Sequence, residues 1–177
     1  NAVPLLDHSA DVNAVGSSGT ALYEAVCGRF TDLCAYLIEK GADVNAGPTP
    51  PLISSVQYGL DTVTNMILEK GGRLDVRDAQ GKTVFMHAAI VGDVHTLDKL
   101  CSKCACSSGE QALTEALNLR CHSGWSALMY AVKAGHHEAY NSIVQFEADL
   151  LAEKECTVSF LLKKNCDCAP PRANGRA

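Results

Sequence analysis

An internal repeat constrains the fold of this 177-residue chain more than any other feature. The segment LLDHSADVNA at 5–14 returns as LIEKGADVNA at 37–46, and MILEKGGRLDV at 66–76 follows the same pattern. Repetition at intervals of roughly 20–50 residues is typical of proteins built by stacking one small unit on the next. A second related segment occurs as TALYEAV at 20–26, PPLISSV at 50–56, TVFMHAA at 83–89 and SALMYAV at 126–132.

Each unit is predicted to consist of two short helices. The first carries apolar residues at i, i+1 and i+4, and the second carries an adjacent apolar pair such as Leu37-Ile38. Helices this short are only marginally stable alone, so neighbouring units must stack to bury their apolar faces. A break containing glycine separates the two helices, at Gly28-Arg29, Gly59, Gly92 and Gly135.

These phrases, together with GKTVFMHAAIVGD at 81–93 and GWSALMYAVKAGHHE at 124–138, resemble the ankyrin repeat, a unit of about 33 residues with a β-finger and two antiparallel helices. The resemblance covers residues 1–149, because the phrases recur in register. It implies an all-α fold, an α-solenoid of ankyrin-like helix-turn-helix repeats with short β-fingers.

The chain departs from the family's Thr-Pro-Leu-His phrase at its last position. In the family, that histidine and the threonine form hydrogen bonds within and between repeats. We therefore expect apolar packing to replace part of this polar network. The histidine position is filled here by Tyr23, Ile53, Met86 and Met129.

The spacing of the repeats predicts how the chain is divided. Spacings of 30, 33 and 43 residues separate the first helices, so the third of the four full units holds an insertion. The insertion contains SGEQ at 108–111, which suits a helix start with Ser108 as N-cap and predicts an extra helix at about 109–119. The predicted organisation is a repeat domain at 1–164, with a partial repeat at 1–14, repeats at about 15–46, 47–77, 78–120 and 121–149 and a helical cap at 150–164, followed by a disordered tail at 165–177.

Composition excludes several classes of function. The formal net charge is −5 and basic residues are scattered, so nothing indicates nucleic-acid binding. No apolar run approaches the ~18 residues that suggest a membrane span, and no phosphate-binding glycine motif occurs. The nine cysteines are an odd number and several lie in apolar helical patterns, which predicts reduced thiols in a cytoplasmic or nuclear protein. The first residue is Asn1, which indicates a piece of a longer protein.

The stretch GWSALMYAVKAGHH at 124–137 combines a serine with a histidine pair but does not indicate catalysis. It lacks the second glycine of a hydrolase nucleophile elbow, and no strand is predicted before it. Ser126 is therefore predicted to cap the start of a helix. His136 and His137 would point about 100° apart on a helix, so they do not readily chelate one metal. The predicted module is non-catalytic and uses no cofactor.

A zinc site is the alternative chemistry that the spacing allows. A cysteine group is followed by a Cys-His pair at a spacing close to that of a zinc motif. The residues are Cys101, Cys104 and Cys106, and then Cys121-His122. Against this, Cys101 occupies an apolar helix position, Cys104 takes the place of a helix-ending glycine, and the second pair is adjacent. The alternative function is a zinc- or thiol-based sensor with the candidate ligands Cys104, Cys106, Cys121 and His122.

The resemblance implies protein binding through the finger tips and the inner face of each first helix. Trp125 is the only tryptophan, and with Tyr58, Ile90 and Val91 it is expected to form an apolar strip with a polar rim. We predict a non-catalytic protein-protein interaction module, monomeric as an isolated domain, with a partner that the sequence does not identify. An accessory regulatory domain of a larger enzyme is a further alternative. The expected partner-binding residues are Tyr58, Gln57, Gln80, Lys82, Ile90, Val91, His122, Ser123, Trp125 and Lys133.

Overall fold

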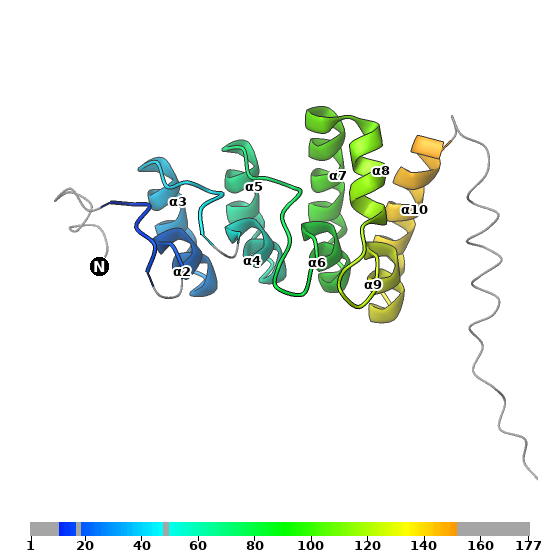
Figure 1. Ribbon diagram of the computed structural model, residues 1–177, viewed down its shortest axis with the longest axis horizontal. Helices are drawn as coiled ribbons and strands as arrows, with labels where there is room; N and C mark the ends of the chain where they lie inside the picture. Colours follow the sequence, from blue (N-terminus) through cyan, green and yellow to red (C-terminus); the bar gives the residue numbers. More distant parts are fainter. Residues whose placement is uncertain (1–10, 17–18, 48–49, 152–177) are drawn as a thin grey trace, which may run out of the picture.

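The computed structural model describes residues 11–16, 19–47 and 50–151, and in these ranges every regular element is a helix (Figure 1). The helices form two rows, each packed against the other and along its own length. The predicted all-α repeat fold is confirmed. The inner row consists of α2 (Ala21–Cys27), α4 (Pro51–Gln57), α6 (Val84–Val91) and α9 (Ala127–Ala134). The outer row consists of α3 (Thr31–Glu39), α5 (Asp61–Glu69), α7 (Val94–Ser108), α8 (Glu110–Asn118) and α10 (His137–Leu151).

Three of the inner helices begin at a hydroxyl side chain. Thr20 Oγ1 accepts a hydrogen bond of 3.2 Å from the Tyr23 N–H, and Thr83 caps α6 in the same way. Ser126 is the N-cap of α9, as predicted, with its Oγ 3.5 Å from the Met129 nitrogen. These caps satisfy N–H groups that a helix start otherwise leaves unpaired.

Each turn between an inner and an outer helix contains a residue in the left-handed conformation. Gly92 ends α6 with φ 79°, and Gly59 and Gly135 have similar angles. Arg29 occupies the same place in the first complete unit with φ 58°, although only glycine adopts this conformation without steric cost. At Gly92 a second constraint applies, because an added Cβ would lie 2.6 Å from the His136 ring.

We expect Gly92→Ala to destabilise the fold more than Gly59→Ala. Both positions have positive φ, which costs an alanine about 1 kcal/mol, and the His136 ring must also move at Gly92, which brings its total cost to about 2 kcal/mol. No atom lies within 4 Å of the corresponding Cβ at Gly59. Urea denaturation of the two variants measures the difference. Equal losses would show that the His136 contact contributes nothing.

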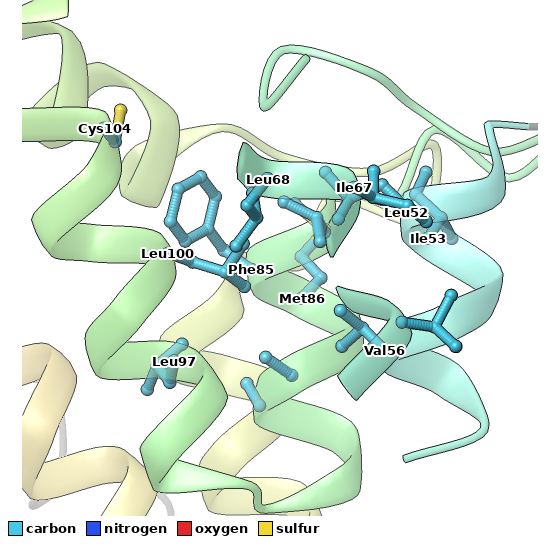
Figure 2. Packing of buried hydrophobic residues seen from close by; sticks show 14 of the residues in the cluster. Leu52, Ile53, Val56, Ile67, Leu68, Phe85, Met86, Leu97, Leu100 and Cys104 are labelled. Atoms are coloured by element: carbon cyan, nitrogen blue, oxygen red, sulfur yellow. The ribbon is translucent and has the colours of Figure 1, made fainter. Parts of the chain in front are cut away.

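The buried core runs between the two rows (Figure 2). Phe85 of α6 is fully buried, and Figure 2 shows it beside Leu100 of α7 and Leu68 of α5. At the histidine position of the repeats, Ile53 and Met86 are buried as expected, whereas Met129 is 41% exposed. Apolar packing therefore replaces the histidine in the two middle units.

The insertion forms α8, at the place where a helix at about 109–119 was predicted. The expected cap was wrong, because Ser108 is the last residue of α7 and Gly109 occupies the N-cap position. Cys104 was also misplaced, because α7 continues past it instead of ending there. α8 packs against both α7 and α10, so the insertion widens the outer row while α6 and α9 stay adjacent.

The predicted boundaries near the two ends of the chain fall partly outside the described residues. α10 runs to Leu151, so the predicted repeat boundary at 149 falls inside a helix. Residues 1–10 of the predicted partial repeat, the predicted cap beyond Leu151 and the predicted tail at 165–177 lie outside the described residues.

Candidate functional site

The loops that precede the inner helices are connected from unit to unit. We call residues 77–83 the third finger and residues 120–126 the fourth finger. Each finger in the described ranges carries at most an isolated bridge, such as Arg77 with Thr83, and no strand. The His122 N–H donates to the Gln80 carbonyl over 3.0 Å, and the His122 ring lies over Gly81. The third and fourth fingers are therefore in direct contact.

The repeated DVN phrase provides further links between fingers. Asn13 Oδ1 accepts from the Asp43 N–H over 2.7 Å, and Asn45 Oδ1 accepts from the Arg73 N–H over 2.8 Å. Arg77 stands where the third phrase would place asparagine, and its guanidinium donates to the Arg120 carbonyl over 3.2 Å. A longer side chain thus also connects to the next unit, but as a donor to a carbonyl where the asparagine oxygens accept from an N–H.

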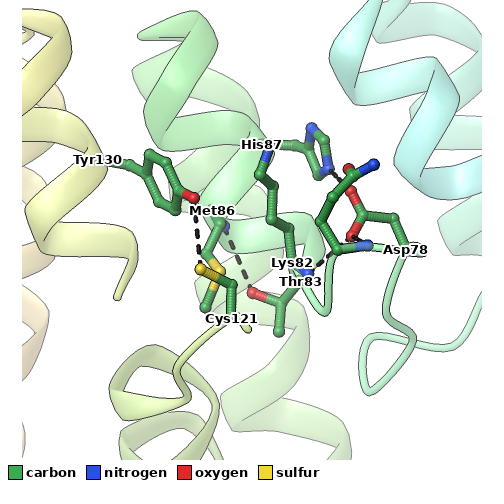
Figure 3. Close-up of polar contacts among 8 residues, drawn as sticks. Asp78, Lys82, Thr83, Met86, His87, Cys121 and Tyr130 are labelled. Atoms are coloured by element: carbon green, nitrogen blue, oxygen red, sulfur yellow. Dashed lines mark hydrogen bonds and ion pairs between the residues drawn. The ribbon is translucent and has the colours of Figure 1, made fainter. Parts of the chain in front are cut away.

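Asp78 organises the third finger (Figure 3). Its Oδ1 accepts from the Gln80 and Lys82 backbone N–H groups over 2.9 and 2.8 Å. Its Oδ2 lies 2.9 Å from Nε2 of His87, and both side chains are almost wholly buried. An ionised carboxylate only accepts, so His87 Nε2 carries the proton. Burial opposes ionisation, but the Lys82 N–H, the His87 ring and the Gln80 N–H hold the pKa of Asp78 below its ordinary value.

Two aromatic rings and two ammonium groups meet beside these fingers. The ring of Trp125 lies 5.5 Å from that of Tyr130, measured between centroids. Lys133 Nζ lies 4.7 Å from the Trp125 centroid, and Lys82 Nζ lies 5.6 Å from the Tyr130 centroid. Cations at this distance from a ring are attracted by its π face. We call Lys82, Trp125, Tyr130 and Lys133 the aromatic–cation cluster.

Cys121 contacts the same cluster from the fourth finger. Its Sγ is 3.3 Å from the Tyr130 hydroxyl (Figure 3). This hydrogen bond lowers the pKa of the Cys121 thiol, and the same contact raises the pKa of Tyr130 to about 12. Tyr130 was not among the expected site residues, although it follows Trp125 by five positions and occupies the register of His87.

The structure brings together five of the expected binding residues: Gln80, Lys82, His122, Trp125 and Lys133. Tyr58 lies apart from them at the end of α4, where Arg29 stacks over its ring at 5.2 Å. Ile90 is half-buried, and its carbonyl accepts from His136 Nε2 over 3.1 Å. The remaining three, Gln57, Val91 and Ser123, are exposed.

The alternative metal ligands lie on two separate elements. Cys104 and Cys106 are on α7, whereas Cys121 and His122 are in the fourth finger. In the described ranges no group of three or more His, Cys, Asp or Glu side chains could hold a metal ion. Burial raises the pKa of Cys101 to about 12 and also raises that of Cys104, so both remain protonated thiols. A sensor based on these cysteines has no geometric support.

The serine and histidines of the 124–137 stretch have structural partners. Ser126 caps its own helix, and His136 donates to the Ile90 carbonyl of the preceding unit. A nucleophilic serine requires a base within hydrogen-bond reach, and Ser126 has no such contact among the described side chains. None of the described helices is long and apolar enough to cross a membrane.

Comparison with known proteins identifies the repeat. A family model of ankyrin repeats in three copies matches residues 52–154, and a model of one ankyrin repeat matches 19–47. Ankyrin repeat and KH domain-containing protein mask-1 of Caenorhabditis elegans is 29% identical over 174 residues, which is 92% of this chain and 6% of that protein. Ankyrin repeat and KH domain-containing protein 1 of Homo sapiens is 34% identical over 85 residues, 45% of this chain and 3% of that protein.

A channel protein shows a similar degree of likeness. Transient receptor potential cation channel subfamily A member 1 of Drosophila melanogaster is 28% identical over 133 residues, 73% of this chain and 11% of that protein. The chain thus spans a small part of the length of each of these relatives. The family models together cover most of the described residues. The chain belongs to the ankyrin repeat family.

Proposed function

We propose that this chain is a non-catalytic module that binds a protein partner through its third and fourth fingers and the adjoining inner helices. Ankyrin repeats are generally protein-protein interaction modules. The observation that supports this surface is the aromatic–cation cluster, in which three of the expected residues, Lys82, Trp125 and Lys133, gather beside Tyr130. The same surface includes the exposed His122 and Ser123 at the finger tip.

The two aromatic residues of the cluster are of the types found in interface hot spots. Tryptophan, tyrosine and arginine are enriched at positions that dominate binding energy, within a polar rim. Trp125 and Tyr130 are half-buried, so their orientations are fixed before a partner arrives while part of each side chain remains accessible. Such pre-ordering reduces the entropy lost on binding.

We expect Trp125→Ala to abolish capture of the partner while leaving the fold intact. Removal of a central aromatic anchor typically weakens an interface by about 2–4 kcal/mol, which is roughly thirtyfold or more in affinity. The measurement is an affinity pull-down from extract with wild-type and variant chains, followed by quantitative mass spectrometry. Thermal unfolding of both chains verifies that the variant is folded.

Tyr36→Ala is the matched control for this experiment. Tyr36 also lies under a lysine, with Lys40 Nζ at 5.5 Å, but it is on the outer helix α3. A protein retained by wild type and Tyr36→Ala but lost from Trp125→Ala meets the expectation. If every retained protein binds all three chains equally, the proposed surface is wrong.

A further inference from the structure

Charged residues are distributed unequally between the two rows of helices. The inner helices α4, α6 and α9 contain no aspartate or glutamate, and α2 contains only Glu24. Each described outer helix carries at least one carboxylate, and α3, α5 and α10 each begin with one in their first turn. The chain's net charge of −5 is therefore a poor guide to the charge of its binding surface.

The aromatic–cation cluster lies in a stretch of surface that is locally basic. Residues 79–92 and 119–137 contain no aspartate or glutamate, yet they include Lys82, Arg120 and Lys133. Arg77 adds a fourth cation at the base of the third finger. Three carboxylates adjoin these ranges in the sequence. Asp78 accepts from Gln80, Lys82 and His87 and is buried inside the finger, whereas Asp93 and Glu138 lie at the starts of the outer helices α7 and α10.

The cations of this surface still have hydrogen-bond donors that a partner can use. Among the described residues, the side-chain ion pairs are Arg73 with Asp75 and His87 with Asp78, so neither Lys82 nor Lys133 has a carboxylate partner. A ring face attracts an ammonium group but accepts none of its conventional hydrogen bonds, so their N–H donors remain available. Arg120 Nη1 donates to the Gly124 carbonyl over 2.7 Å and to the Met129 sulfur over 3.9 Å, which leaves at least three of its five N–H groups available.

From this arrangement we infer that the surface binds an acidic segment of its protein partner. Aspartate or glutamate side chains pair with Lys82, Lys133 and Arg120, and an apolar side chain between them packs against Trp125. The inference rests on the proposed function and specifies the chemistry of the partner. A local positive field within a chain of negative net charge steers an acidic segment toward this face and repels it from the outer row.

The tryptophan provides a direct measurement of binding. Trp125 is the only tryptophan, so its fluorescence reports on this surface without a label. The probes are two short synthetic peptides of equal length, one of repeated Glu-Glu-Leu and the other of repeated Lys-Lys-Leu. We expect only the acidic peptide to change the emission in a saturable manner. Raising the salt concentration from about 50 mM to about 500 mM shortens the Debye length and should weaken this binding severalfold.

Lysine variants locate the interaction. Lys82→Gln and Lys133→Gln are each expected to weaken binding of the acidic peptide by about two- to fivefold, and the double variant by about tenfold. Lys40→Gln is the matched control, because Lys40 also lies over an aromatic ring but on the outer side of the fold. It should leave the affinity unchanged.

Three results would overturn the inference. The first is equal binding of the two peptides, and the second is an affinity of the lysine variants for the acidic peptide equal to that of wild type. The third is tighter binding of a uridine oligonucleotide than of the acidic peptide. The last result would make this a general polyanion surface. Failure of the proposed function looks different. In the pull-down, one outcome is partner capture that depends on Trp125 but not on Lys82, Lys133 or the salt concentration. That result would refute the acidic specificity and leave the proposed protein-binding module standing. Equal capture by wild type and Trp125→Ala would refute the module itself.

Discussion

Phe85→Ala is expected to lower the free energy of unfolding by about 3–5 kcal/mol, the largest loss for any single substitution considered for this chain. Phe85 is fully buried at the junction of α6 with the outer row. Its truncation removes apolar contact area and leaves a cavity that the surrounding helices fill only in part. In a stack where each unit contacts only its neighbours, the loss also uncouples the units on either side of α6.

Urea denaturation followed by far-ultraviolet circular dichroism measures this loss. Phe30→Ala is the matched control, because the same ring at position 30 is 61% exposed. It should change stability by less than about 1 kcal/mol. Similar midpoints for the two variants would contradict the placement of Phe85 in the core. A broadened or two-step transition for Phe85→Ala would show the expected uncoupling.

Asp78→Ala is expected to have the second largest effect, a loss of about 3 kcal/mol. The substitution removes the acceptor of two backbone N–H groups and of the His87 ring. Asp78→Asn should cost less, because its amide oxygen can still accept from Gln80 and Lys82. Its amide nitrogen can donate to His87 only if the ring changes tautomer. Thermal unfolding at neutral pH compares the two variants, and equal losses would contradict the backbone role of the carboxylate.

The ionisation of Asp78 should also make the free energy of unfolding depend on pH. Its pKa is lower in the folded protein than its ordinary value, so the folded state binds the proton less tightly than the unfolded state. The contribution is therefore complete above the ordinary carboxyl pKa and is lost as the pH falls through the lower folded value. Asp78→Asn should lose less stability than wild type in this acidic range. The measurement is acid denaturation of wild type and Asp78→Asn side by side. An identical dependence of stability on pH in the two proteins would contradict the prediction.

Several features could be predicted from the sequence because they depend on neighbours along the chain. Ser126 was recognisable as a helix start from its place before an apolar pattern. The helix of the insertion was recognisable from its spacing, and α8 lies where it was expected. The cap of α8 could not be predicted. The letters SGEQ match a capping box, but the sequence does not show whether Ser108 starts a helix or ends the preceding one.

The candidate site could not be predicted in full from the sequence, because it is formed by contacts between units. Trp125 stood out as a lone tryptophan, but Tyr130 gave no signal until the structure placed Lys82 of the preceding unit over its ring. The basic character of the surface was hidden by the net charge of −5, because the sequence does not show that the carboxylates follow the outer row. The cysteine spacing suggested zinc ligands that the fold places on different elements.

The sequence by itself determined the repeat, the helix pairs and the apolar positions that face between units. The tertiary structure decided how deeply each position is buried. Met86 and Ala89 of α6 are fully buried, whereas Met129 and Val132, which occupy the equivalent positions in α9, are 41% and 55% exposed. The patterns are alike, but α6 has a helix on each side and α9 has α6 on one side with no described inner helix on the other. Burial depends on the neighbour that covers a face, and one unit's sequence does not specify that neighbour.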